Sequence, residues 1–256
     1  EAMQILNEAV DIFYQQRIDQ GAIEIERNEI SIKIEEGKQI EVSIRDSSLR
    51  SEHIVSELMI LTNMLTARYF AEHRIPAIYR TQIEPDLNNL NEEGHEVVKR
   101  FQTLRRLKPL ELSLEPKPHA TLGVNMYCQI TSPIRRYNDL ILQRQLSTGL
   151  QQQPAFYDPD AMMDELSLLE RSKVLNKIGV RRAWYWLLKY INEQNDMTMK
   201  AVVLESRERD VFIELLDFGS RLTLKPERSL AVGEEITVKP MLVDAWSGTL
   251  RLTQVK

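Results

Sequence analysis

The feature that most constrains the fold is a change in the spacing of apolar residues at the polar segment 192–196. Before this segment, apolar side chains recur at helical intervals over residues 1–20, 50–73 and 161–193, which predicts helices with a buried face. After it, five short apolar stretches are separated by turn-forming residues, the pattern of antiparallel strands. Five short strands within residues 197–256 predict a small β-barrel of the OB type.

The segment between the first two helices has a different periodicity. Isoleucine and valine alternate with polar residues from residue 23 to residue 44, which predicts a meander of about three short strands. The polar residues 46–48 are then expected to cap the long helix that follows. Residues 86–108 are expected to form a short, increasingly basic helical connector. The chain therefore predicts an α+β protein with a helix-rich part over residues 1–193 and a barrel over residues 197–256.

The composition sets limits on the class of protein. With 256 residues and 43% apolar content, the chain can bury the core of one large or two ordinary domains. A single cysteine, Cys128, excludes an internal disulfide and fits a reducing compartment, so a cytoplasmic location is expected. Apolar runs stay well below the roughly 20 residues that span a membrane, and no membrane partner is expected. The first residues, which do not resemble a native start, suggest a piece of a longer protein.

The net charge of −5 is distributed unevenly along the chain. Residues 1–98 carry 9 basic and 19 acidic side chains, whereas residues 99–144 carry 9 basic and 3 acidic ones. Local clustering of basic residues is the usual electrostatic feature of a protein with a polyanionic partner. An exposed basic surface without a partner is the alternative.

The basic block contains the motif Thr-Ser-Pro-Ile-Arg-Arg-Tyr at residues 131–137. A hydroxyl of Thr131 or Ser132 can cap a helix, and Pro133 suits the first helical position. A helix is therefore expected to begin here and to continue to about residue 147, with Ile134 and Tyr137 on its buried face.

Two arginines would then occupy the first turn of that helix. Cations are disfavoured there because the helix dipole already makes this end positive. A phosphate bound by Arg135, Arg136 and the free backbone N–H groups would compensate. The alternative is an ion pair inside the protein with Asp139, which lies three and four residues further along.

Glu57 falls within the apolar helix predicted over residues 50–73. A carboxylate rarely enters a core without a partner. Glu57 is therefore either the ion-pair partner of an arginine or a polar group that lines a site. The sequence contains no glycine-rich phosphate loop, no Cys-x-x-Cys pair, no histidine pair at metal-ligand spacing and no nucleophile elbow. The residues by themselves thus predict phosphate binding without a catalytic centre.

Residues 119–139 resemble the RNB family of exoribonucleases, which includes ribonuclease II and ribonuclease R. The family motif reads roughly His-x-x-Leu-Gly, a tyrosine, and Thr-Ser-Pro-Ile-Arg-[Arg/Lys]-Tyr-x-Asp, and every position is matched between His119 and Asp139. The flanking segments 21–25, 55–63 and 75–80 are similar as well. The last 60 residues look like the OB-type RNA-binding domain, of ribosomal-protein S-one type, that ends these enzymes.

The resemblance implies processive hydrolysis of single-stranded RNA from its 3′ end, with release of nucleoside 5′-monophosphates. It implies that Arg135 is catalytic and neutralises charge at the phosphate, and that Glu57 lies near the terminal ribose. The other expected substrate-binding residues are Arg80, His119, Thr131, Ser132, Arg136 and Tyr137, of which His119 and Tyr137 should mainly pack and fix loops. Independently of the resemblance, the residues themselves suggest that Asp139 holds an arginine in place.

The resemblance also implies a magnesium cofactor, whose aspartate ligands lie in an earlier part of the catalytic domain in this family. No metal ligand is therefore expected in this chain, which should need the preceding portion of the same protein as a partner and be inactive alone. The alternative is a non-catalytic RNA-binding module that kept the phosphate motif and the barrel. The barrel residues expected to bind RNA are Lys200, Arg207, Arg209, Phe212, Phe218 and Arg221. Trp184 and Trp186 are expected to pack rather than to stack on bases.

Overall fold

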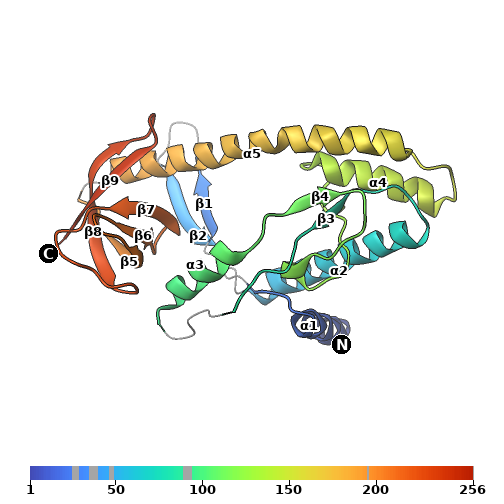
Figure 1. The fold of residues 1–256 in the computed structure, drawn as a ribbon, viewed down its shortest axis with the longest axis horizontal. Helices are drawn as coiled ribbons and strands as arrows, with labels where there is room; N and C mark the ends of the chain where they lie inside the picture. The colour runs from blue at the N-terminus through green and yellow to red at the C-terminus, as the bar shows by residue number, and fades with distance from the viewer. Residues whose placement is uncertain (25–28, 35–39, 46–48, 89–93, 195, 256) are drawn as a thin grey trace. The chain divides into compact units, whose positions relative to one another are not determined.

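The computed structural model of the chain describes residues 1–24, 29–34, 40–45, 49–88, 94–194 and 196–255 (Figure 1). The chain divides into two compact units, each assembled from segments that are distant in sequence. The first comprises Glu1–Glu24, Ser48–Asp86 and Arg106–Lys173, and the second comprises Ile25–Ser47, Leu87–Arg105 and Val174–Lys256. Because these units group spatial contacts rather than consecutive sequence, the expected domain boundary between residues 193 and 197 stays a prediction.

The first unit consists of helices and one short pair of strands. It contains α1 (Ala2–Asp19), α2 (Arg50–Glu72), α4 (Tyr137–Leu150), the 3₁₀ turn η1 (Ala120–Leu122), the antiparallel strands β3 (Tyr79–Thr81) and β4 (Glu111–Ser113), and the beginning of α5 (Pro159–Glu193). Phe70 of α2 and Leu142 of α4 belong to one fully buried cluster, which also includes Cys128. The helices expected over residues 1–20 and 50–73 are therefore present. The apolar face of α2 contributes to this core, whereas Val10 is the one apolar residue of α1 that is buried.

The second unit is organised around a five-stranded antiparallel barrel. Its strands are β5 (Met199–Ser206), β6 (Val211–Leu215), β7 (Ser220–Leu224), β8 (Glu235–Asp244) and β9 (Thr249–Gln254), in the spatial order β7-β6-β5-β8-β9. The outer strands β7 and β9 approach one another, so the barrel is nearly closed. Leu187 and Ile191 of α5 pack into its core. The predicted α+β class with a terminal barrel of the OB type is confirmed.

Helix α3 (Glu96–Arg106) covers one outer face of this barrel. Along β5, Ala201 and Val203 face the barrel core, whereas Val202 and Leu204 pack against Phe101 and its neighbours on α3. Successive residues of a strand point to opposite faces, so β5 is buried on both sides. This explains why its sequence reads as a continuous apolar run rather than as an alternating one.

The segment between α1 and α2 differs from the expected meander. It forms a hairpin of two described strands, β1 (Glu29–Lys33) and β2 (Glu41–Arg45), which pair antiparallel. Residues 21–24 form no strand, and residues 25–28 lie outside the described part of the chain. The helix cap expected at residues 46–48 also lies outside it, and α2 begins after Leu49 without a side-chain cap.

Candidate functional site

The arginine motif lies in a turn that precedes α4 and not inside the helix. The backbone N–H groups of Arg135 and Arg136 donate to the carbonyl oxygen of Ser132 at 3.3 and 3.0 Å. Arg136 has an extended backbone with φ −131° and ψ 113°, and α4 begins at Tyr137. The expectation that the helix begins at Pro133 is therefore wrong, and neither hydroxyl of the motif caps it. Ile134, which was expected on the buried face, is fully exposed for the same reason.

A buried carboxylate explains this start of the helix. Asp139 is inaccessible to solvent, and its Oδ2 accepts hydrogen bonds from the backbone N–H of Ser132 at 2.8 Å and from Nε of Arg136 at 3.0 Å. It lies in the first turn of α4, where a negative charge is favoured by the helix dipole. The side chain of Asp139 thus takes over the task expected of the hydroxyls and ties the turn to the helix.

The two arginines of the motif have different surroundings. Arg136 is half-buried, pairs with Asp139 and also donates to Oγ1 of Thr131 at 3.3 Å. Arg135 is exposed, and its guanidinium forms no hydrogen bond or ion pair with any residue that the structure describes. The internal ion pair therefore accounts for Arg136, whereas the charge of Arg135 is available to an external anion.

Arg80 and His119 form a second polar group beside the motif. Nη1 of Arg80 donates to Oε1 of Gln129, and burial lowers the pKa of Arg80, with the nearby charge of Arg136 adding to this effect. His119 is 6% exposed and packs edge-on against Tyr127, with 5.6 Å between ring centroids. Nε of Arg80, Nδ1 of His119 and Oδ1 of Asp139 are buried without a hydrogen-bond partner among the described residues. Because buried polar atoms are normally paired, the cluster keeps unused hydrogen-bonding capacity.

Asn63 of α2 fastens this cluster to the core. Its Nδ2 donates to the Tyr127 hydroxyl at 2.8 Å, and its Oδ1 accepts from the backbone N–H of Ile130 at 2.9 Å. Asn63 is itself fully buried. The segment that leads into the motif is therefore held at two points by one side chain from a rigid helix.

His119 is expected to stay neutral at physiological pH. Burial and the charge of Arg80 lower the pKa of His119 from 6.5 to about 4. Since the unfolded chain takes up a proton first as the pH falls from 7 to 4, acidification destabilises the fold through this residue. The loss should be on the order of 2–3 kcal/mol at pH 4 and absent above pH 7. Urea unfolding of wild type and His119→Gln across this range checks it, and equal pH profiles would contradict it.

Glu57 is part of a buried ion pair. Its Oε2 accepts from Nε of Arg17 at 2.9 Å, and its Oε1 pairs with Nη2 of the same arginine. Arg17 also donates from Nη1 to the carbonyl oxygen of Leu122 at 2.7 Å. The structure therefore realises the first alternative for Glu57, that of an arginine partner, and a contact with ribose stays a prediction. The sequence reasoning did not identify Arg17 as the partner of Glu57. The available signal was the helical spacing of Val10, Phe13 and Arg17, which places Arg17 on the same face of the helix as two apolar residues.

The remaining motif residue, Tyr137, does not pack into the core. It is 45% exposed and its hydroxyl donates to Oε1 of Glu165 on α5 at 3.1 Å. The prediction that Tyr137 packs on the buried face of the helix is therefore wrong. Its position at the start of α4 instead leaves the ring at the surface beside the turn.

Several barrel residues expected to bind RNA are engaged within the second unit. Phe212 packs against Phe101 of α3 with 5.8 Å between ring centroids, and Phe218 belongs to the barrel core. Arg221 pairs with Glu214 at 2.8 Å, and Arg207 pairs with Glu205 at 3.1 Å. Lys200 and Arg209 are exposed. RNA binding by these six residues stays a prediction, but α3 already covers the face that carries Phe212 and Arg221.

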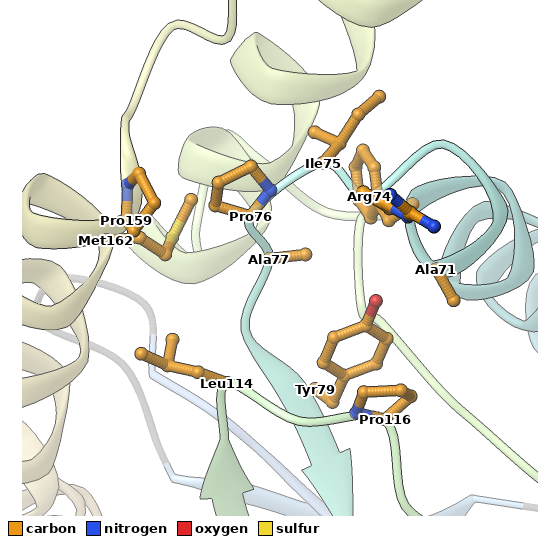
Figure 2. A pocket seen from close by; sticks show the side chains of 11 residues that line it. Ala71, Arg74, Ile75, Pro76, Ala77, Tyr79, Leu114, Pro116, Pro159 and Met162 are labelled. Atoms are coloured by element: carbon orange, nitrogen blue, oxygen red, sulfur yellow. The ribbon is translucent and has the colours of Figure 1, made fainter.

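A separate pocket of about 320 Å³ lies behind β3 in the first unit. Figure 2 shows that its walls are largely apolar, with Ile75, Leu114 and Met162 among them and Arg74 as a charged side chain. Tyr79 lines it, and burial raises the pKa of the Tyr79 hydroxyl above its ordinary value. Arg80, the next residue of the strand, points to the opposite face, so this pocket is not part of the arginine motif.

The described residues do not fit a metal site. Within the described ranges, no group of three or more His, Cys, Asp or Glu side chains lies close enough to hold a metal ion.

The sequence of the chain is similar to those of known proteins. Residues 1–152 match the RNB domain. The chain is 28% identical over 259 residues to an uncharacterized ribonuclease of Synechocystis, covering 98% of this chain and 39% of that protein. It is 27% identical to the chloroplastic and mitochondrial ribonuclease II of Arabidopsis thaliana, covering 93% of this chain and 31% of that protein. The chain thus spans less than half the length of these relatives.

Solved structures share the fold. The Dss1 exoribonuclease of Candida glabrata, an active-site mutant, aligns with a TM-score of 0.85 and 24% identity over 100% of this chain and 35% of its own. Mycoplasma genitalium RNase R in complex with double-stranded RNA aligns with a TM-score of 0.78 and 19% identity over 99% of this chain and 50% of its own.

Two findings bear on the cellular location of the protein. Among the helices that the structure describes, none is long and apolar enough to cross a membrane. The relatives include a chloroplastic and mitochondrial protein, so a cytoplasmic location stays a prediction.

The match to residues 1–152 includes the arginine motif and covers more than half of the sequence. On this basis, the chain belongs to the RNB domain family.

Proposed function

We propose that the protein to which this chain belongs is a hydrolytic 3′-to-5′ exoribonuclease. It degrades single-stranded RNA processively and releases nucleoside 5′-monophosphates. The observation that carries the proposal is Arg135, which is exposed and has no partner among the described residues, in a turn fixed by Asp139 and Arg136, in a chain of the RNB domain family. Support also comes from relatives named as ribonucleases and from an RNase R solved with RNA.

The turn explains what this chain contributes to the reaction. A guanidinium can donate two parallel hydrogen bonds to phosphate oxygens, and Arg135 would neutralise the charge that develops there. Asp139 pairs with Arg136, so the buried carboxylate does not compete with phosphate for Arg135. Because the turn is already fixed, little ordering is required when RNA binds. The proposal includes a magnesium cofactor for the whole protein, whose ligands would come from outside the described residues of this chain.

The experiment uses the whole protein encoded by the gene, with magnesium and a single-stranded RNA about 20 nucleotides long. RNA labelled at its 3′ end should release a labelled mononucleotide first, whereas RNA labelled at its 5′ end should stay long until late. Chromatography should identify nucleoside 5′-monophosphates as the main product. Single-stranded DNA of the same sequence is the matched control and should stay intact.

The second candidate is a non-catalytic RNA-binding module. The exposed Arg135 and the terminal barrel suit such a module as well, because holding a phosphate needs no metal ligand. It predicts salt-sensitive binding of the same RNA without any shortening. Internal cleavage, or release of nucleotides from the 5′ end, would contradict both candidates.

A further inference from the structure

A cluster of aromatic side chains lies at the surface of the second unit, where the β8–β9 turn meets α5, with Trp246 exposed and Tyr185 and Trp186 half-buried. Trp246 is 86% exposed. Its ring lies 5.5 Å from that of Tyr185, which in turn lies 5.2 Å from the ring of Trp186, as measured between centroids. Scattered apolar residues at a surface are ordinary, but a tryptophan that is almost fully exposed and adjoins further, partly exposed aromatic rings is characteristic of a binding site.

The fold holds Trp246 in this exposed position. Oδ1 of Asp244 accepts from the backbone N–H groups of Trp246 and Ser247 at 3.0 and 3.3 Å. Nε1 of Trp184 donates to the carbonyl oxygen of Gly248 at 2.8 Å and ties the turn to α5. Gly248 has a φ of +71°, which glycine adopts readily. The indole is thus presented by an ordered turn, and Trp184 has the packing role expected of it.

The neighbouring face of α5 is basic. Arg182, Tyr185 and Lys189 follow one another at spacings of three and four residues, which places them on one face of the helix. Nζ of Lys189 lies 5.9 Å from the Tyr185 ring centroid. The sequence has no acidic residue between Arg171 and Asn192. Arg182 and Lys189 form no ion pair with the residues that the structure describes, so their charges are not compensated locally.

We propose that this aromatic–basic surface, formed by Arg182, Tyr185, Lys189 and Trp246, binds single-stranded RNA. A base would stack on the exposed Trp246 ring beside the half-buried ring of Tyr185, and phosphates would contact the arginine and the lysine. Uncompensated positive charge favours a polyanion over an apolar protein surface. The identity of the nucleic acid rests on the proposed function. The surface differs from the barrel face first expected to bind RNA, which α3 covers.

The test measures binding of fluorescent 2′-O-methylated single-stranded RNA, which lacks free 2′-hydroxyls, to the whole protein. Trp246→Ala should weaken binding of an oligomer about 20 nucleotides long by roughly 5-fold or more, the loss expected for one stacked base. Trp246→Phe should keep most of the affinity. Arg182→Ala and Lys189→Ala should each lower the slope of log affinity against log salt by about 0.7. The control is Phe156→Ala, an aromatic in the first unit that is also exposed, at 57%, which should leave affinity unchanged.

The outcomes separate this inference from the proposed function. If Trp246→Ala and Lys189→Ala retain wild-type affinity while the wild-type protein degrades RNA, the exoribonuclease proposal stands, and this surface serves a protein segment instead. If the protein binds RNA through Trp246 but never shortens it, the surface assignment stands and the exoribonuclease proposal fails. Far-UV circular dichroism of each variant distinguishes a local effect from unfolding.

Discussion

Arg135→Ala in the whole protein should lower the rate of RNA degradation by roughly 100- to 1,000-fold. The reason is geometric, because Arg135 is exposed and unpaired among the described residues while its neighbour Arg136 is held by Asp139. Removing this side chain breaks no ion pair or hydrogen bond in the part of the chain that the structure describes, so the melting temperature should stay unchanged. Single-turnover degradation of labelled RNA measures the rate, and differential scanning calorimetry measures the melting temperature.

Two further variants sharpen this prediction. Arg135→Lys keeps the charge but loses the two-pronged hydrogen bonding of the guanidinium, so its rate should fall between those of wild type and Arg135→Ala. Arg74 is likewise exposed and lies outside the motif, so Arg74→Ala should degrade RNA at the wild-type rate. A rate for Arg135→Ala within threefold of wild type would rule out a role in catalysis.

Glu57→Gln should lower the free energy of unfolding by about 3–5 kcal/mol. Both partners of the Arg17–Glu57 pair are buried, with side chains 7% and 5% exposed. Removing the carboxylate charge leaves the Arg17 guanidinium buried without a counter-charge, which costs far more than the pair itself contributes. Urea unfolding, followed by the fluorescence and the far-UV circular dichroism of the protein, measures the change.

The same helix supplies the matched control. Arg68 and Glu72 of α2 form an exposed pair, with 2.6 Å between Nε and Oε1. Glu72→Gln should change the free energy of unfolding far less, because water screens exposed ion pairs. Replacing both buried partners by apolar residues, as in Arg17→Met with Glu57→Leu, should recover part of the loss. Equal effects of Glu57→Gln and Glu72→Gln would show that burial does not strengthen the pair.

Local periodicity was sufficient to predict most elements. The helical spacing over residues 50–73 and the short apolar stretches after residue 196 were found as α2 and as β5–β9. The start of α4 was misplaced because Thr131, Ser132 and Pro133 all have the residue types of a helix start. A carboxylate seven residues beyond Ser132 bonds to the Ser132 backbone, and no propensity scale represents a bond over that distance.

Contacts between residues that are distant in sequence also limited the prediction of the barrel surface. Phe212 and Arg221 have the residue types of an RNA-binding face, but Phe101, more than 100 residues earlier in the sequence, packs against both. The sequence pattern does not predict a role for Trp246, because a single tryptophan in a turn is not part of any periodic pattern. Its exposure and its contact with Tyr185 are properties of the packed unit.

The sequence by itself determined the α+β class, the order of helices and strands, and the resemblance to the RNB family. These follow from the spacing of apolar residues and from a contiguous motif, both of which are local. The tertiary structure alone decided which charges are paired. It joins Arg17 to Glu57 and Asp139 to Arg136, and it leaves Arg135 exposed. The physical reason is that the partner of a buried charge is selected by packing. Packing brings together Arg17 and Glu57, which no sequence spacing relates, and it selects Arg136 over Arg135 as the partner of Asp139, a choice that the spacing left open.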